Sequence, residues 1–258
     1  MRLTSVFTLL GLLAFSVTPY STQAQAGPVL DAMEKAGEVR IGLMGDYPPF
    51  SSLKDGQYSG LDVDLARSLA GALGLKLFIV RTSWPTLSAD LEAGQFDIAM
   101  GGISVTQARR QIGFFSVPMM SDGKTPITAC ANVARFQTLD EIDHKGIRVI
   151  VNPGGTNEKF ARAHIHHATI IVHPDNRTIF DEIIAGRADL MITDATETRW
   201  QAKEHRALCA VHPDAPFDHT EKAYFMPKDA ELKALVDEWL TRLKEIGALQ
   251  RKIDRWVK

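Results

Sequence analysis

Short strand-like runs alternate with helical patterns along this chain, and the alternation occurs twice. The first half holds three strand-like runs and two helical patterns, at residues 39–43, 61–73, 75–81, 84–93 and 96–100. In segment 61–73 every fourth residue from Leu61 is leucine, and Gly74 follows as the expected C-cap. This β-α-β-α-β order predicts a parallel sheet with crossover helices.

The same pattern returns in the second half, so the chain predicts a two-lobed α/β fold. Strand-like and helical segments follow one another at residues 146–151, 157–164, 170–172, 176–185 and 190–192. We expect each lobe to be a central, mostly parallel sheet flanked by helices. A crossover near residues 120–130 predicts a discontinuous first lobe, residues 27–128 with 220–258, and a second lobe of residues 129–219.

The C-terminal segment 232–256 has the pattern of a strongly amphipathic helix. Gly247 interrupts it, so we expect a break at this point. An apolar stripe on a helix needs a surface to cover it, and we expect the segment to pack back onto the first lobe.

The first residues have the composition of a secretory signal peptide. Arg2 gives a positive start, residues 6–17 are almost wholly apolar, and residues 24–26 supply a small-x-small pattern. The apolar run is too short to cross a bilayer, so we expect cleavage near Ala26, with an uncleaved anchor as the alternative. The predicted signal peptide is therefore residues 1–26, and the predicted location is the periplasm. No later segment has the length and apolarity of a membrane span.

The charge of the chain is balanced and dispersed. Lys and Arg number 29 against 31 Asp and Glu, for a formal net charge of −2. This pattern excludes the basic footprint of a nucleic-acid-binding protein and a polybasic membrane patch. We expect a small molecule as partner, and the composition is compatible with a homo-oligomer as well as with a monomer.

Two cysteines, Cys130 and Cys209, lie in the part expected to be exported. An oxidising compartment favours a disulfide between them, worth roughly a few kcal/mol, and two buried free thiols are the alternative. Neither cysteine has a CxxC or Cys/His spacing. Four histidines lie close together, at His164, His166, His167 and His173. No acidic residue or cysteine accompanies them in the sequence pattern, so we expect no metal site.

The loops that follow the strands are the candidate site, because ligands of parallel α/β sheets bind beyond the carboxyl ends of the strands. In the first lobe these loops present Tyr47, Phe50, Trp84, Gly102, Ser104 and Arg109. Glycines, hydroxyls and an arginine around a turn suit a carboxylate, which arginine binds with two parallel hydrogen bonds. The alternatives are a packed loop for the two rings of segment 45–50, a hydrophobic staple for Trp84 and a solvated side chain for Arg109.

In the second lobe a glycine-containing loop precedes a helical pattern. It presents Gly154, Gly155, Thr156 and Asn157. The glycines allow the backbone to approach a ligand closely, and the helix N-terminus favours a small anion. The spacing is not that of a dinucleotide-binding loop.

Three charged residues complete the candidate set. Asp194 and Glu197 have N-cap and N3 spacing, so a structural capping box by itself explains both. Lys124 lies near the predicted crossover and either reaches the cleft or is an ordinary exposed lysine.

These loops together resemble the type 2 periplasmic solute-binding proteins, specifically their polar amino-acid-binding branch. The matching segments are residues 47–50, 60–65, 96–99, 106–109, 115–118 and 154–156. The resemblance covers essentially the whole chain after the predicted signal peptide. In that family an arginine grips the ligand α-carboxylate, which implies this role for Arg109.

Longer contiguous runs resemble the cyclohexadienyl dehydratases, a family of periplasmic enzymes on the same fold. These runs are residues 82–85, 122–128, 134–139, 151–162, 172–176 and 209–213. The general acid of the family is a glutamate in a Thr-Asp-x-x-Glu segment, which matches Glu197. The resemblance also implies cleft roles for Asn157, Lys124 and Trp84, and it implies no cofactor.

The implied activity is that of a hydro-lyase, which converts prephenate to phenylpyruvate and arogenate to phenylalanine. Loss of CO2 and water makes the ring aromatic, so the protein must hold carboxylates and protonate the departing hydroxyl. We therefore expect Glu197, Asn157 and Lys124 to be catalytic. The expected substrate-binding residues are Arg109, Ser104, Thr156, Trp84, Tyr47, Phe50, Asp194 and Gly102. A non-catalytic polar amino-acid-binding protein of an ABC transporter is the alternative.

The predicted general acid stands in an unfavourable place on electrostatic grounds. A carboxyl near a helix N-terminus tends to have a lowered pKa, which opposes proton donation at neutral pH. Glu197 therefore needs an apolar, water-excluding closed cleft to raise its pKa.

Overall fold

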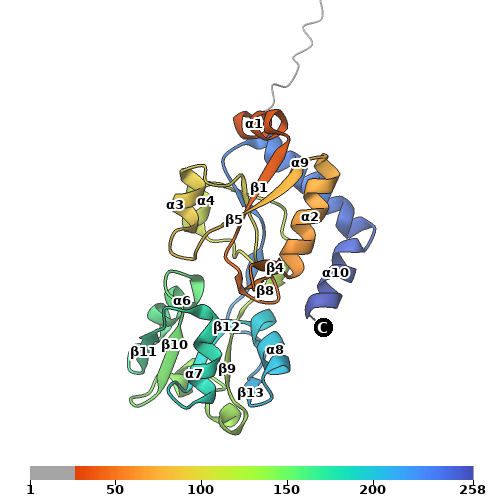
Figure 1. Ribbon diagram of the computed structural model, residues 1–258. Helices are drawn as coiled ribbons and strands as arrows, with labels where there is room; N and C mark the ends of the chain where they lie inside the picture. The colour runs from red at the N-terminus through yellow and green to blue at the C-terminus, as the bar shows by residue number, and fades with distance from the viewer. Residues whose placement is uncertain (1–26, 258) are drawn as a thin grey trace, which may run out of the picture.

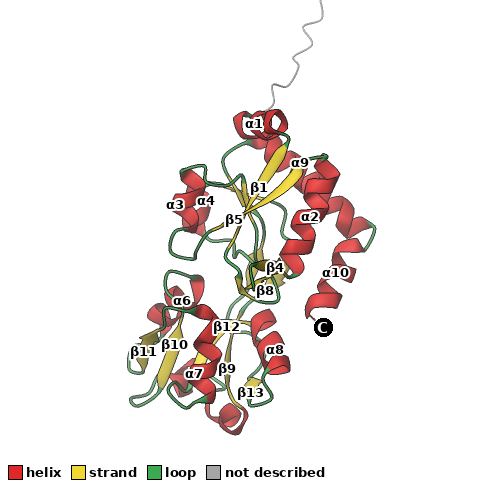
Figure 2. Ribbon diagram, viewed as in Figure 1, coloured by secondary structure: helices red, strands yellow, loops and turns green. Residues whose placement is uncertain are grey.

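The protein consists of two lobes, each built on a five-stranded sheet (Figure 1). This computed structural model describes residues 27–257, so the predicted signal peptide, residues 1–26, lies outside the described part of the chain. Helices flank both sheets (Figure 2). The predicted two-lobed α/β architecture is confirmed.

The sheet of the first lobe has the strand order β5-β1-β6-β15-β7. Its strands are β1 (Glu38–Leu43), β5 (Lys76–Arg81), β6 (Ile98–Ala99), β7 (Phe114–Phe115) and β15 (Phe225–Met226). β1 pairs in parallel with β5 and β6, and β15 runs antiparallel to both of its neighbours. A small antiparallel sheet, β2-β3-β4, adjoins it, formed by Asp46–Tyr47, Ser51–Lys54 and Gln57–Ser59.

The helices of the first lobe cover this sheet with apolar faces. They are α1 (Pro28–Ala36), α2 (Leu61–Leu73), α3 (Leu87–Glu92), α4 (Gln107–Ile112), α9 (Ala230–Glu245) and α10 (Ala248–Val257). The predicted leucine face of α2 is confirmed, because Leu61, Leu65 and Leu69 are fully buried in the core. Gly74 follows the helix as its C-cap, with a backbone conformation in the left-handed region. α3 is shorter than predicted, because Trp84 forms part of the turn before it.

The sheet of the second lobe has the equivalent order β11-β10-β12-β9-β13. Its strands are β9 (Lys124–Ala129), β10 (Arg148–Val151), β11 (Thr169–Val172), β12 (Leu190–Asp194) and β13 (Leu208–Ala210). The helical segments are η1 (Cys130–Arg135), α5 (Leu139–Ile142), α6 (Thr156–His164), η2 (Asn176–Thr178), α7 (Ile179–Ile184) and α8 (Ala195–Glu204). β10 pairs in parallel with β11 and β12, and β9 is antiparallel to both of its neighbours.

The structure corrects the predicted lobe boundary at residue 128. β9 is a central strand of the second sheet, so the second lobe already begins there. The lobes are joined by the antiparallel pair β8 (Met120–Asp122) and β14 (Thr220–Lys222). The strand was missed because Pro126, which has no N–H to donate, argues against a central strand.

The C-terminal helices contact both lobes, whereas only the first was predicted. Gly247, with φ of 66°, separates α9 from α10 as expected. The Trp256 indole donates to Asp64 Oδ2 in α2 at 2.9 Å. Its ring also lies 6.5 Å from that of Trp200 in α8 of the second lobe. The end of α10 therefore bridges the two lobes, as Figure 1 shows.

Cys130 and Cys209 form a disulfide that joins η1 to β13. The predicted pairing is confirmed, and the alternative of two free thiols is excluded. None of the helices within residues 27–257 combines the length and apolarity that a membrane span requires.

Candidate active site

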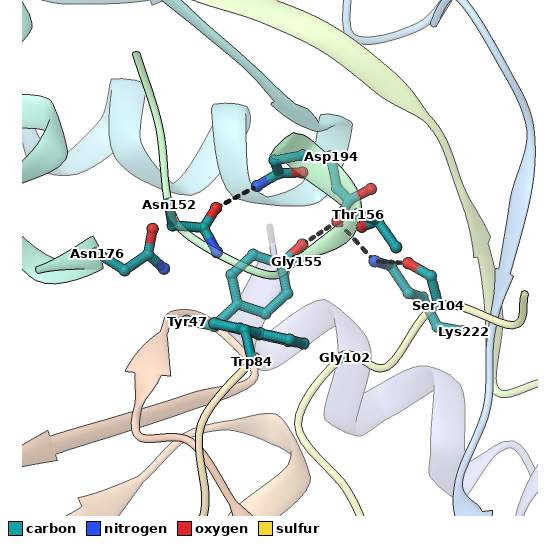
Figure 3. Close-up of a pocket in the computed structure, with 11 residues that line it drawn as sticks. Tyr47, Trp84, Gly102, Ser104, Asn152, Gly155, Thr156, Asn176, Asp194 and Lys222 are labelled. Atoms are coloured by element: carbon teal, nitrogen blue, oxygen red, sulfur yellow. Dashed lines mark hydrogen bonds and ion pairs between the residues drawn. The ribbon is translucent and has the colours of Figure 1, made fainter. Parts of the chain in front are cut away.

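A small cavity lies between the lobes (Figure 3). Both lobes and the connecting strand β14 contribute to its wall. The lining residues are Tyr47, Trp84, Gly102, Ser104, Asn152, Gly155, Thr156, Asn157, Asn176, Asp194 and Lys222. Seven predicted site residues are thus brought together although they are distant in sequence: Tyr47, Trp84, Gly102, Ser104, Thr156, Asn157 and Asp194.

The first lobe supplies an aromatic wall. Trp84 stands edge-on to Tyr47 with 5.4 Å between ring centroids, and its indole nitrogen donates to Asp46 Oδ1 at 3.1 Å. Trp84 also lines the cavity, and its contact with a ligand stays a prediction. Phe50 is fully buried, stacks against Tyr47 from behind and is not among the lining residues. Phe50 supports the wall in this structure rather than forming its surface.

The glycine turn after β6 is shaped by a buried carboxylate. Asp62 Oδ2 accepts the N–H groups of Gly101 and Gly102 at 2.8 and 2.6 Å. Gly102 has φ of 69°, and a Cβ there would lie 2.6 Å from the Phe50 ring. Only glycine fits at this position, so the turn can lie directly against the aromatic wall.

Arg109 is buried beside the cavity. Its Nη1 donates to the Ser104 carbonyl at 2.8 Å, and burial lowers the pKa of the guanidinium to about 10, which leaves it charged at neutral pH. Arg109 is not among the lining residues. Its predicted role as a carboxylate anchor stays a prediction.

The second lobe supplies a polar wall at the start of α6. Lys124 is 1% exposed, so the alternative of an ordinary surface lysine is wrong. Its Nζ donates to Thr156 Oγ1 at 3.0 Å, to Asn157 Oδ1 at 2.5 Å and to Asp194 Oδ1 at 2.8 Å. Asn157 Nδ2 donates in turn to Thr193 Oγ1 at 2.9 Å. Lys124, Thr156 and Asn157, which were predicted separately as site residues, form one hydrogen-bonded unit.

Gly154 and Gly155 have different surroundings. Gly155 lines the cavity, as expected for a glycine that lets a ligand approach. Gly154, with φ of 75°, instead lies against the other lobe, because a Cβ there would be 2.7 Å from Pro85 Cα. Its small size allows the lobes to meet.

Asp194 is the centre of a buried ionic cluster. Besides Lys124, its carboxylate accepts from Lys222 Nζ at 2.6 Å and from the Tyr47 hydroxyl, and Lys222 also donates to Ser104 Oγ at 2.9 Å (Figure 3). Burial acts to raise the pKa of Asp194, but the two lysines outweigh it and hold the pKa well below its usual range. Asp194 is therefore ionised at neutral pH.

Glu197 lies in the first turn of α8 and is 0% exposed. Its Oε2 accepts from the Thr193 hydroxyl at 2.5 Å, and its Oε1 is buried with no hydrogen-bond partner among residues 27–257. Burial, reinforced by the charge of Asp194 and opposed by the Thr193 hydrogen bond, raises the pKa of Glu197 to about 8. At neutral pH this side chain is a carboxylic acid, so the enclosed site overrides the helix N-terminus.

The capping-box interpretation of Asp194 and Glu197 is wrong. Asp194 is the N-cap residue of α8 by position, but its side chain makes no capping hydrogen bond. Its oxygens are directed to Lys124, Lys222 and Tyr47 instead. Glu197 is not itself a lining residue; Thr193 links it to Asn157 in the cavity wall.

Three lining residues, Lys222, Asn176 and Asn152, were not predicted. Lys222 comes from β14 after the second lobe, and no local motif marks it. Asn176 Nδ2 donates to the Asp46 carbonyl across the lobes at 2.8 Å, and its Oδ1 is buried without a partner in the described chain. Asn176 lies inside one of the dehydratase-like runs, so that run could have pointed to it.

The histidine cluster is organised by an acidic residue that the sequence pattern does not reveal. Asp143 accepts the backbone N–H groups of residues 166–168 and bonds to His167 Nδ1 at 2.9 Å. Within residues 27–257 no group of three or more metal-binding side chains comes together.

Comparison with known proteins identifies the fold family. The family model of bacterial extracellular solute-binding proteins, family 3, matches residues 39–258. The chain is 52% identical over 238 residues to the cyclohexadienyl dehydratase of Pseudomonas aeruginosa, which covers 92% of this chain and 88% of that protein. It is also 26% identical to the L-cystine-binding protein TcyJ of Escherichia coli, over 88% of this chain and 85% of that one.

Two solved structures extend the comparison. An ancestral amino acid-binding protein, described as a precursor of cyclohexadienyl dehydratase, is 34% identical with a TM-score of 0.83, covering 89% of this chain and 99% of its own. An ancestral cyclohexadienyl dehydratase is 47% identical with a TM-score of 0.57, covering 90% and 97%.

Proposed function

The chain belongs to the bacterial extracellular solute-binding proteins of family 3, and from this premise we propose that it is a periplasmic cyclohexadienyl dehydratase. The 52% identity to the Pseudomonas aeruginosa enzyme over most of both chains supports this function. Residues 1–26 serve in this proposal as the export signal.

The observation that carries the proposal is Glu197, a fully buried carboxyl with one oxygen unpartnered within residues 27–257, whose pKa burial raises to about 8 beside the cluster of Lys124, Lys222 and Asp194. A simple binding protein has no need of an enclosed acid. An enzyme that expels hydroxide needs one, because water is a far better leaving group. Lys124 and Lys222 supply the complementary requirement, positive charge for a carboxylated substrate.

The reaction balances with one proton from the protein. The bond from the ring to its carboxylate breaks, and its electron pair enters the ring as the molecule becomes aromatic. The C–O bond on the opposite side of the ring breaks at the same time, and the hydroxyl leaves with the Glu197 proton as water. CO2 departs, and the Glu197 carboxylate regains a proton from solvent.

The other residues position the substrate in this proposal. Asn157 lines the cavity and accepts a hydrogen bond from Lys124 behind it, and together they position the substrate against Trp84. Arg109 and Thr156 anchor the carboxylates. The closed lobes exclude water, which keeps the pKa of Glu197 high until the hydroxyl departs.

Purified protein incubated with prephenate tests the function, with phenylpyruvate followed by its absorbance. We expect turnover without any added cofactor. Absence of turnover, combined with strong thermal stabilisation by an amino acid, would support the alternative of a non-catalytic amino-acid-binding protein. This alternative is worth testing because the chain is 34% identical to an ancestral amino acid-binding protein.

A further inference from the structure

The first N–H groups of α8 are bonded to a segment outside the helix. A helix leaves these groups without partners of its own, and in a buried place they need other acceptors. The Ala195 N–H donates to the Gly123 carbonyl at 2.8 Å. The Thr196 N–H donates to Asp122 Oδ1 at 3.2 Å, and both helix residues are buried. The Asp122 side chain therefore does for α8 what an N-cap side chain usually does.

Asp194 holds the N-cap position of α8 but does not cap the helix. Its side chain makes no capping hydrogen bond. Its oxygens accept from Lys124, Lys222 and Tyr47 instead. The ionic cluster and the helix cap are thus formed by separate carboxyls, and Asp122 is the second one.

Asp122 is a buried carboxyl that the proposed mechanism does not otherwise use. It is 7% exposed, and its Oδ1 also accepts the N–H of Gly123 at 2.9 Å. Burying a carboxyl costs free energy, which the hydrogen bonds from Thr196 and Gly123 offset in part. The backbone of Asp122 is the end of β8, where it pairs with Thr220 of β14. The cap is therefore fixed to the strand pair that joins the lobes.

The cap does not depend on the charge of Asp122. Burial, reinforced by the charge of Asp194 and opposed by that of Lys222, raises the pKa of Asp122. Oδ1 accepts from Thr196 in both protonation states, because a proton can reside on Oδ2, which has no partner among residues 27–257. An uncharged acceptor at this position should therefore serve as well.

We propose that Asp122 is a positioning residue for the reaction, which caps α8 from the connecting strand and so holds Glu197 in place for proton transfer. The inference rests on the proposed function. Glu197 follows Thr196 directly, so its backbone belongs to the turn that Asp122 fixes. Within the described chain its carboxyl is held by one hydrogen bond, from Thr193. The place of the acid therefore depends on how firmly this turn is held.

An uncapped first turn would affect Glu197 in two ways. The end of a helix without a cap opens more readily, and a displacement of about 1 Å at a reacting group is costly in rate. The freed Thr196 N–H would also be a donor beside Glu197, and a hydrogen bond to a carboxylate favours its charged form. Neither effect involves the residues that hold the substrate. The expected signature is a lower kcat at a nearly unchanged KM.

Asp122→Ala and Asp122→Asn separate the cap from other contributions of the carboxyl. Asparagine is as good a cap as aspartate and keeps an acceptor, whereas alanine has none. We expect kcat with prephenate to fall about tenfold in Asp122→Ala, with KM changed by no more than about twofold. In Asp122→Asn we expect kcat within about threefold of wild type. Thr138→Ala removes the cap of α5 in the same lobe and is the matched control, which should keep both constants.

Two kinetic outcomes would overturn the inference while leaving the dehydratase function intact. One is an unchanged kcat in a folded Asp122→Ala protein. The other is an equal loss of kcat in both Asp122 variants, which would show that the charge acts and not the acceptor. Absence of turnover in the wild-type protein would overturn the function itself.

The pH–rate profile distinguishes positioning from a general loss of stability. In Asp122→Ala the freed Thr196 N–H should lower the pKa of Glu197, so we expect the alkaline decline of kcat to move to lower pH by about half a pH unit. The charged side chains that act on Glu197 stay the same in this variant: Asp194, Lys124 and Asp46. A lower kcat with the decline at the wild-type pH would overturn the inference, because lost stability explains that result.

Hydrogen exchange of the wild-type protein tests the cap without mutation or substrate. The first amides of a helix exchange readily when no acceptor holds them, so a capped Thr196 amide should be protected. NMR measures the exchange rate of this amide. Rapid exchange at Thr196 would overturn the inference, including the case in which Asp122→Ala does not fold.

Discussion

Asp194 and Glu197 stand three residues apart at the start of one helix, and both are buried, yet they hold opposite protonation states. Asp194 lies on the cationic side of the cavity wall, where two lysines and a tyrosine satisfy it. Glu197 lies on the other side, where Thr193 satisfies one oxygen and the second has no partner in the described chain. Burial alone would raise both pKa values, so the neighbours decide which carboxyl stays charged.

This division gives the two carboxyls separate tasks. A charged Asp194 fixes the lysines and orders the polar wall. In the proposed mechanism, an uncharged Glu197 keeps a proton available for the leaving group. Asp194 stays charged because two lysines contact it, whereas Glu197 keeps its proton because no cation of the described chain bonds to it.

Glu197→Gln gives the largest expected effect. The amide cannot donate an acidic proton, so we expect kcat with prephenate to fall about 10²–10⁴-fold while substrate binding is retained. Phenylpyruvate absorbance and calorimetric binding measure the two quantities. Glu204→Gln, at the exposed end of the same helix, is the control and should keep full activity. Retained activity in Glu197→Gln would return this residue to a purely structural role.

Asp194→Asn should instead act on stability. The change leaves two buried lysines without their counter-charge, which we expect to cost about 3–5 kcal/mol in the free energy of unfolding. Urea unfolding followed by fluorescence measures it. Asp214→Asn removes the exposed ion pair with Arg199 and should have no measurable effect. A stable Asp194→Asn protein would show that the lysines do not depend on this carboxylate.

The pH dependence of stability should separate the two carboxyls further. Glu197 has a folded-state pKa of about 8 against an ordinary value of 4.5, so between these values only the folded state keeps the proton. Wild-type stability should therefore fall relative to Glu197→Gln as pH rises from 5 to 8, by at most roughly 1.4 kcal/mol per unit. Urea unfolding of both proteins across this range measures the difference. A constant difference would mean that Glu197 is ionised in the folded protein.

Thr193→Val gives the smallest expected effect. The threonine hydrogen bond lowers the pKa of Glu197, so its loss should move the alkaline decline of kcat, expected near pH 8, to higher pH. We also expect about a tenfold lower kcat, because the carboxyl loses a positioning contact. A pH–rate profile distinguishes this from general damage, which would lower kcat without moving the decline.

Much of the architecture was accessible from the sequence because local periodicity encodes it. The leucine spacing of α2 and the break at Gly247 both appear as predicted. The strand containing Pro126 was missed because its sequence preference opposes the place that the sheet gives it.

The site was only partly predictable. Motif resemblance pointed to Lys124, Asn157 and Glu197, and the structure brings all three to one wall or directly behind it. Lys222 was missed because it comes from a strand far along the chain with no motif around it. Phe50 was assigned to the cavity surface, but the packing of Tyr47 over it places it behind the wall.

The sequence by itself determined the two lobes, the candidate loops at the strand ends and the two cysteines available to pair. These follow from periodicity, spacing and composition, which are local or countable. Only the tertiary structure decided which carboxyl keeps its proton. The protonation of Asp194 and Glu197 depends on burial and on charges such as Lys124 and Lys222, which folding brings from 70 and 28 residues away.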